Sequence, residues 1–244
     1  YLMPEKAIKT GHKKAFSGIR YTTQAIKIEH ATGLLETQGI SALERYWAKL
    51  RADKKAGPIL RDPDISQAMA RSRALAEAGC KHPKMSAICS VVDRTLAENP
   101  QARIIIFASY RDTVKEIVGV LSSLEQARPI ILMGQRDGLS QKEQIEVIKR
   151  FGEGDCNILV TTSIGEEGLS IESADIAVFY EAVPSEIRQI QRRGRVGRVR
   201  IGKIIILITK NTRDEAYYWA ARQKERRMHK TLKGMANQEA LQNP

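Results

Sequence analysis

The stretch Arg103-Ile104-Ile105-Ile106-Phe107 is a short run of almost continuous apolar residues, rich in the β-branched type that favours strands. The segment Asn157-Ile158-Leu159-Val160-Thr161 repeats this pattern further along the chain. Apolar runs of strand length that alternate with amphipathic stretches are typical of a parallel sheet with helices on both faces. The sequence therefore predicts an α/β fold. The expected strands are 103–107, 129–133, 157–161, 175–180 and 203–208, and the expected helices are 112–124, 141–151 and 185–193.

Two capping boxes mark helix starts in this part of the chain. Ser140-x-x-Glu143 and Thr212-x-x-Glu215 each combine a hydroxyl residue with a glutamate three positions later, a pattern that satisfies two backbone N–H groups at a helix start. The second box predicts a final helix over 213–235. We interpret Asp214 and Glu215 as first-turn acids that favour the helix dipole, rather than as metal ligands.

Residues 1–83 contain no strand pattern and are predicted to form a separate, all-helical domain. A second helix is expected to open at Ser41-x-x-Glu44 and to end at Gly57-Pro58, and a third to follow Asp62-Pro63 as far as Gly79. The first helix is expected to bury one face, including a hydrogen-bonded core histidine. The residues of that face are Phe16, Ile19, Thr23, Ile26 and His30.

The net charge of +12 favours a polyanionic partner such as nucleic acid. The helical region has 15 Lys and Arg against 8 Asp and Glu (+7), whereas the remainder has 25 against 20 (+5). The region 1–83 is therefore the more basic part per residue. The binding of nucleic acid is expected to involve it directly.

The composition also limits the class of protein. No apolar run approaches the roughly 20 residues of a membrane span, and the N-terminus lacks the layout of a signal peptide. Because the chain begins at Tyr1 rather than Met, we expect a fragment of a longer polypeptide. Three cysteines without CxxC spacing predict reduced thiols that fill core positions, a cytoplasmic protein and no metal site. The oligomeric state is left open.

The segment Gln191-Arg192-Arg193-Gly194-Arg195-Val196-Gly197-Arg198 is the sharpest chemical signal. Four arginines in eight residues are compatible with a solvated basic patch. The spacing of Arg195 and Arg198 around Gly197 favours another interpretation, because glycine lets a backbone approach a ligand closely. Two guanidinium groups delivered together match the oxygens of a phosphoryl group.

This segment resembles motif VI of superfamily-two helicases, Q-x-x-G-R-x-G-R, at every fixed position. Other segments resemble further helicase motifs in the same order, and the chain is similar to the group that contains archaeal Hef, the Fanconi anaemia M translocase and the RIG-I-like RNA sensors. In that group a basic helical domain lies between two RecA-like domains. The segments that carry the resemblance are 105–111 (motif IV), 138–144, 159–171 (motif V), 180–188 and 212–219.

The resemblance implies a second RecA-like domain over 84–212, preceded by the helical insert 1–83 and followed by a basic helix and tail over 213–244. Arg195 and Arg198 would be arginine fingers toward the γ-phosphate of ATP, with Gln191 beside them. The ATP cleft would also include Gly165, Glu167, Gly168 and Ser170, the last standing where the family usually has Asp. Nucleic-acid contacts would come from Thr161, Thr162, Ser109, Tyr110, Arg111 and Gln135.

No G-x-x-x-x-G-K-[ST] phosphate loop occurs in the chain. The resemblance therefore implies that ATP and Mg²⁺ are held mainly by a first RecA-like domain in cis, and that this chain alone is inactive as an ATP hydrolase. The implied function is the second half of an ATP-dependent helicase or translocase on branched or forked DNA. One alternative is a nucleic-acid-binding module, or degenerate motor half, without ATPase activity. Another is an RNA-directed helicase of the same superfamily, because phosphate contacts do not distinguish DNA from RNA.

Overall fold

A computed structural model describes residues 13–134, 140–162, 173–181, 200–220 and 222–223. The chain divides into two compact units, Tyr1–His82 and Pro83–Pro244. The first unit is helical in its described residues and the second contains the sheet. No helix among the described residues is long and apolar enough to span a membrane.

The second unit contains a five-stranded parallel sheet with the strand order β2-β3-β1-β4-β5. The central strand β1 pairs Phe107 with Thr161 of β3 on one side and with Phe179 of β4 on the other. All five strands were predicted, and the α/β fold is confirmed. Their bounds are β1 Ile104–Phe107, β2 Pro129–Leu132, β3 Ile158–Thr161, β4 Ser173–Phe179 and β5 Arg200–Ile206.

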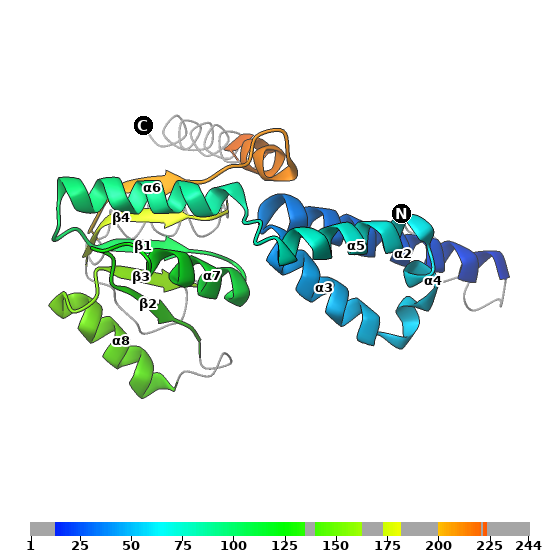
Figure 1. Cartoon of the computed structure of the whole chain (residues 1–244), viewed down its shortest axis with the longest axis horizontal. Helices are drawn as coiled ribbons and strands as arrows, with labels where there is room; N and C mark the ends of the chain where they lie inside the picture. Colours follow the sequence, from blue (N-terminus) through cyan, green and yellow to red (C-terminus); the bar gives the residue numbers. More distant parts are fainter. Residues whose placement is uncertain (1–12, 135–139, 163–172, 182–199, 221, 224–244) are drawn as a thin grey trace, which may run out of the picture. The chain divides into compact units, whose positions relative to one another are not determined.

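Helices cover both faces of this sheet. The helices α6 (Pro83–Glu98) and α7 (Arg111–Leu121) lie on one face, and α8 (Gln141–Glu153) lies on the other (Figure 1). Successive residues of a strand point to opposite faces, so Ile104 and Ile106 pack toward α6 and α7 while Ile105 packs toward α8. This explains why the central strand β1 is apolar at every position, whereas β4 and β5 also contain Asp175 and Lys203.

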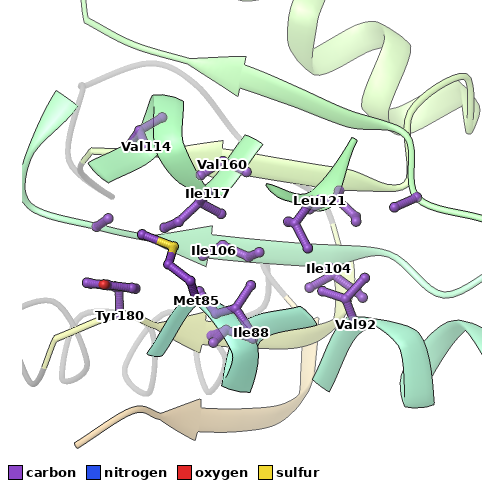
Figure 2. Close-up of a cluster of buried hydrophobic side chains, with 14 of the residues drawn as sticks. Met85, Ile88, Val92, Ile104, Ile106, Val114, Ile117, Leu121, Val160 and Tyr180 are labelled. Atoms are coloured by element: carbon purple, nitrogen blue, oxygen red, sulfur yellow. The ribbon is translucent and has the colours of Figure 1, made fainter. Parts of the chain in front are cut away.

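The core between the sheet, α6 and α7 is closely packed (Figure 2). Full burial of each such aliphatic side chain contributes about 1.5–3 kcal/mol. The helix α6 was not predicted, although its buried apolar residues recur at helical spacing. Those residues are Met85, Ile88, Val92 and Leu96.

The capping box at Ser140 is confirmed, with both reciprocal hydrogen bonds present and Glu143 at the third position. The hydrogen bonds from Ser140 hold the pKa of the Glu143 carboxyl below its usual value. The second box differs from the prediction. Thr212 accepts from the N–H of Asp214, but Glu215 accepts from the N–H of Asn211 instead of Thr212.

The helical unit contains α2 (Lys13–Thr37), α3 (Ile40–Ala52), a 3₁₀ turn at Lys54–Ala56, α4 (Gly57–Leu60) and α5 (Pro63–Glu77). Its core surrounds Trp47, which is 3% exposed. The third helix was predicted to follow Asp62-Pro63, and α5 begins at Pro63 with Asp62 as its N-cap, accepting from the N–H groups of Asp64 and Ile65. The predicted all-helical bundle is confirmed in the described residues.

Two predicted helix boundaries in this unit are wrong. The helix α3 begins after Gly39, which has φ 96° and is the N-cap, so that Ser41 is the second residue of the helix rather than its cap. A side chain at position 39 would also meet the Cβ of His82. Both the positive φ and this close approach therefore require glycine there. The pair Gly57-Pro58 opens α4 rather than ending α3, because proline suits the first turn of a helix.

The predicted buried face of the first helix is also wrong. Ile26 is 63% exposed and His30 is exposed, with its ring 4.9 Å from that of Tyr46. The buried residues of α2 are Ala31 and Leu34, near its end. At about 1.5 Å per residue, the 25 residues of α2 span about 37 Å against about 20 Å for the 13 of α3. Much of α2 therefore extends beyond its partner helix.

The cysteines follow the core-filling prediction only in part. Cys156 is buried and Cys89 is partly buried, but Cys80 is exposed after the end of α5. Burial and a nearby Asp93 raise the pKa of the Cys89 thiol, so that group is a poor nucleophile at neutral pH. Cys80 follows Gly79, whose φ of 72° places it in a turn rather than in the core.

Candidate functional site

The carboxyl ends of the strands meet at one edge of the sheet. The register places Leu132, Thr161, Phe107, Phe179 and Ile206 side by side as the last paired residues of the five strands. Loops at this edge of an open parallel sheet are where ligands of such folds bind. Each predicted site residue that the structure describes follows, or ends, one of these strands.

Ser109 and Glu181 meet across the boundary between β1 and β4. The Ser109 hydroxyl donates to Oε2 of Glu181 at 2.9 Å, and the Ser109 backbone N–H donates to the same oxygen at 3.0 Å. The contact follows from the register, since Phe107 pairs with Phe179 and each of these residues lies two positions further on. Glu181 is only 9% exposed, and its carboxylate fixes the start of the β1–α7 loop.

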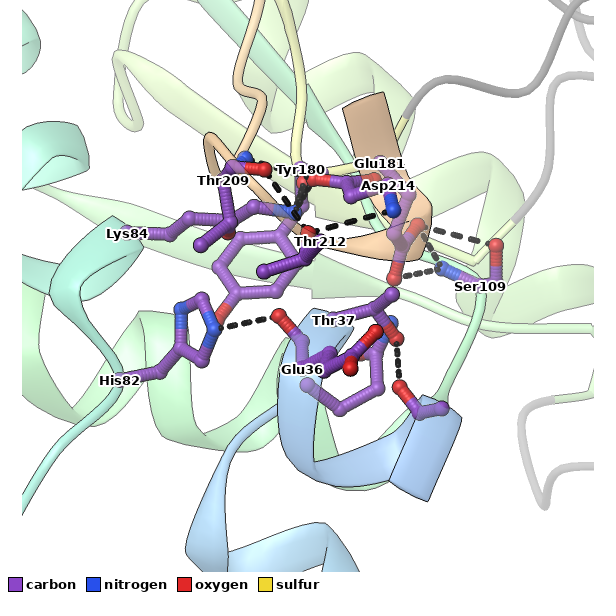
Figure 3. A network of polar contacts seen from close by, with 12 residues as sticks. Glu36, Thr37, His82, Lys84, Ser109, Tyr180, Glu181, Thr209, Thr212 and Asp214 are labelled. Atoms are coloured by element: carbon purple, nitrogen blue, oxygen red, sulfur yellow. Dashed lines mark hydrogen bonds and ion pairs between the residues drawn. The ribbon is translucent and has the colours of Figure 1, made fainter. Parts of the chain in front are cut away.

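Lys84 and Asp214 form a buried ion pair at the same edge (Figure 3). The Lys84 ammonium lies 2.5 Å from Oδ2 of Asp214, and both side chains are 4% exposed. Lys84 also donates to the backbone carbonyl of Tyr180 at 2.8 Å and lies 5.0 Å from the centre of the Tyr180 ring. The first turn of α6, the end of β4 and the helix that begins at 213 are thereby joined.

Hydrogen bonds in the turn before that helix hold the Asp214 carboxylate in place. The Thr212 hydroxyl donates to the carbonyl of Thr209 at 2.8 Å, and the Thr209 N–H donates to Oδ2 of Asp214 at 2.9 Å. Asn211 has φ 59°, the left-handed conformation that asparagine tolerates better than most residues. The carboxylate is thus held by a backbone donor as well as by Lys84.

Burial dominates the electrostatics of this edge. It lowers the pKa of Lys84 below its usual value in spite of the favourable contact with Asp214. Burial, with the nearby carboxylates of Glu116, Glu181 and Asp214, raises the pKa of Tyr180. Burial and Glu181 also raise the pKa of Tyr110. Both tyrosines therefore stay neutral at physiological pH.

The structure places five of the six residues predicted to contact nucleic acid. Thr161 is the last residue of β3 and is 3% exposed, while Thr162 follows it and is half-buried. Tyr110 is 41% exposed at the N-cap of α7, and Arg111 begins that helix. Ser109 is exposed although its hydroxyl is engaged by Glu181. These residues lie at the carboxyl ends of the adjacent strands β1 and β3.

The residues predicted for the ATP side lie outside the described residues, as does Gln135. They are Gly165, Glu167, Gly168, Ser170, Gln191, Arg195 and Arg198. Within the described ranges, no group of three His, Cys, Asp or Glu residues could hold a metal ion.

Sequence reasoning missed Glu181 and Lys84 as residues of this edge. Glu181 could have been found, because it directly follows an apolar strand, at the edge of a parallel sheet where ligands bind. Lys84 gives no comparable signal, since its partners lie far along the chain. Asp214 was correctly placed in a first helical turn, but its burial was not foreseen.

Both units of the chain match known protein families. Residues 83–200 match the helicase conserved C-terminal domain, and residues 5–75 match the helical bundle described for an ATP-dependent RNA helicase family. The sheet unit is therefore the C-terminal, RecA-like domain of a helicase, preceded by a helical bundle domain.

Individual relatives show to which group of helicases the chain belongs. The solved helicase domain of Hef from Pyrococcus furiosus shares 39% identity with a TM-score of 0.74 over 88% of this chain and 46% of that one. A protein of Methanocaldococcus jannaschii named as an ATP-dependent RNA helicase is 44% identical over 89% of this chain. The ATP-dependent DNA helicase mph1 of Neurospora crassa is 40% identical over 56% of this chain. The chain belongs to the superfamily-two helicases, in the group of Hef and Mph1.

The chain spans only part of these relatives. It corresponds to 28% of the length of the Methanocaldococcus protein and to 12% of the Neurospora helicase. What the complete protein does is therefore a proposal built on the residues of this chain.

Proposed function

We propose that this chain is the second RecA-like half of an ATP-dependent motor that translocates on or unwinds branched or forked DNA. Its part in catalysis is to supply Arg195 and Arg198 to the γ-phosphate of ATP, with Gln191 ordering the phosphates or the attacking water. A first RecA-like domain in cis would hold the β-phosphate and Mg²⁺. The proposed setting is the cytoplasm or the nucleoid.

The observation that carries the proposal is the motif VI sequence at 191–198 in a chain that also has the parallel sheet of a RecA-like domain. Both arginines stand at the fixed positions of motif VI, and a domain that only binds nucleic acid does not need two guanidinium groups at that spacing. An arginine finger is worth about 10³–10⁵ in the rate of phosphoryl transfer. The presence of both residues favours a working motor over a degenerate one.

The carboxyl edge supports a strand-binding role for the described residues. Thr162 follows β3, and Tyr110 lies between β1 and α7. Both residues therefore lie at the carboxyl ends of the adjacent strands β1 and β3. A half-buried hydroxyl and backbone N–H groups suit phosphate oxygens, and an exposed tyrosine ring suits a base or sugar. The part-buried Ser109–Glu181 contact holds this loop in one conformation and so prepares it for binding.

Two other functions compete with this one. A binding module without ATPase activity would use the arginines as a basic patch. An RNA-directed helicase would use the same residues, and relatives named for RNA and for DNA both resemble the chain. DNA is favoured because several relatives are named as the DNA helicase mph1, and one of these is similar over 77% of the length of this chain.

The test is strand separation by the complete protein. We expect Mg·ATP-dependent unwinding of a forked DNA duplex, faster than that of a linear duplex or of a forked RNA of the same sequence. The 244-residue chain alone should release phosphate at less than about 0.1 s⁻¹, well below the enzyme median near 10 s⁻¹. Hydrolysis by the chain alone, or a preference for RNA, would contradict the proposal as stated.

A further inference from the structure

An aromatic and cationic cluster lies on the helix that follows the sheet. Residues 213–220 and 222–223 are helical, and the start of this helix is fixed to the sheet by the Lys84–Asp214 ion pair. Trp219 is 52% exposed one turn further on. A bulky indole in water is not explained by the core of this unit.

Three side chains of the cluster are organised against one another. The rings of Tyr218 and Trp219 lie 5.1 Å apart between centres at an interplanar angle of 71°. The guanidinium carbon of Arg222 lies 5.9 Å from the centre of each ring, and its Nη1 donates to the Tyr218 hydroxyl at 2.8 Å. Positions 218 and 222 are one helical turn apart, so the contact is intrinsic to the helix.

This arrangement is suited to an unpaired base beside a phosphate. Exposed indole rings stack on the faces of nucleobases regardless of sequence. A guanidinium has five N–H donors, and Arg222 uses one of them on Tyr218, which leaves others for phosphate oxygens. Bases within a duplex are covered on both faces by their neighbours, so a stacking site of this kind selects single strands.

The surrounding charge favours the same ligand. Residues 213–235 contain seven Lys or Arg against three acids. One of the acids, Asp214, is buried and paired with Lys84. A second, Glu215, accepts a hydrogen bond from the backbone N–H of Asn211. The sequence of 213–235 is therefore complementary to a polyanion.

We propose that Tyr218, Trp219 and Arg222 form a stacking platform for a single-stranded segment of the nucleic acid on which the protein acts. The proposal rests on the proposed function for the nature of the ligand. It adds a contact beyond the carboxyl edge of the sheet, on a helix that the fold holds by a buried ion pair.

The experiment measures the affinity of the complete protein for two labelled strands by fluorescence anisotropy. One strand is a thymidine homopolymer and the other is an abasic strand of the same length and charge. Trp219→Ala should weaken binding to the thymidine strand by about tenfold, in the range for loss of one stacked base. Affinity for the abasic strand should stay unchanged, and Trp219→Phe should retain most of the thymidine affinity.

Tyr217→Ala is the matched control, because Tyr217 is 60% exposed on the same helix but is outside the cluster. It should leave both affinities unchanged. The proposal is wrong if Trp219→Ala weakens both strands equally, if Tyr217→Ala has the same effect, or if neither affinity changes because another part of the protein covers the indole. ATP hydrolysis that remains in such a case would leave the proposed function standing.

Discussion

The ammonium of Lys84 at the start of α6 lies 2.5 Å from the carboxylate of Asp214 at the start of the last described helix, and both side chains are 4% exposed. This ion pair joins the first and last described elements of the RecA-like unit at the carboxyl edge of its sheet. The Tyr180 carbonyl accepts a hydrogen bond from Lys84, and the Thr209 N–H donates one to Asp214. The unit is thus closed by an ion pair that spans most of its sequence.

Removal of one partner of this pair should be strongly destabilising. Asp214→Asn keeps the shape of the side chain but leaves the Lys84 ammonium buried without its counter-charge, which costs about 3–5 kcal/mol of unfolding free energy. The double variant Lys84→Met with Asp214→Leu should lose less than the single variant. Urea denaturation measures both. If Asp214→Asn leaves the free energy of unfolding unchanged, the claim that the buried ion pair stabilises the fold is contradicted.

Glu153→Gln provides the comparison for this experiment. Its contact with Lys149 is 3.9 Å long on the exposed face of α8, with both side chains more than half exposed. Water screens such a pair, so its removal should leave the denaturation midpoint unchanged.

The depressed pKa of Lys84 predicts a dependence of stability on pH. Between the folded pKa and the ordinary lysine value of 10.5, the unfolded chain binds more protons than the folded one, so stability contributed at this site rises with pH. The difference in unfolding free energy between the natural chain and Lys84→Met should therefore increase from neutral pH toward about pH 10. The slope cannot exceed about 1.4 kcal/mol per pH unit. If this difference decreases with pH instead, the ion pair with Asp214 raises the pKa of Lys84 by more than burial lowers it.

The sequence predicted the sheet because its central strands β1 and β3 are buried on both faces and are therefore almost continuously apolar. It failed where a helix depends on its partners. Ile26 fits a helical apolar pattern but is 63% exposed, whereas its neighbour Lys27 lies on the side that meets the partner elements, accepting from the Tyr46 hydroxyl and pairing with Asp53. It also placed the start of α3 at Ser41, where the backbone of Gly39 decides the boundary.

The candidate site was predictable where a motif is continuous in sequence and not where it depends on register. Thr162, Ser109 and Tyr110 lie at strand ends, as their sequence neighbours indicated. Glu181 acts on Ser109 only because β1 and β4 are adjacent, and strand order is not written in either strand. The contact between Lys84 and Asp214 likewise depends on the fold, which brings together two segments that are far apart in the sequence.

The basic helical unit should bind phosphates of the nucleic acid. Arg51, Lys54 and Lys55 are exposed at the end of α3 and in the following turn. Replacement of all three by Gln in the complete protein should reduce the slope of log affinity against log salt by up to about 0.9 for each phosphate that is no longer neutralised. Lys149→Gln on α8 is the control. An unchanged slope would mean that this surface does not bind nucleic acid.

Thr162 should couple strand binding to hydrolysis. Thr162→Ala removes a hydroxyl that we expect to donate to a phosphate, so the stimulation of ATP hydrolysis by DNA should require more DNA, while hydrolysis without DNA changes little. Thr162→Ser keeps the hydroxyl and should retain the coupling. Equal loss in both variants would assign Thr162 a packing role instead.

The central claim is that Arg195 and Arg198 act on ATP and not on the strand. Arg192 is the matched control, because it lies in the same basic segment at a variable position of the motif. A basic patch would treat all three arginines alike, whereas two arginine fingers would not.

The deciding measurement is kcat for DNA-stimulated ATP hydrolysis by the complete protein, with DNA affinity measured in parallel. Arg195→Ala and Arg198→Ala should each lower kcat by at least about 100-fold. Lysine should not restore the rate at either position, because it lacks the planar fork. Arg192→Ala should leave kcat nearly unchanged, and DNA affinity should change little throughout. If instead the three alanine variants lose DNA affinity alike, and hydrolysis falls only through that loss, the segment is a basic patch and the account is contradicted.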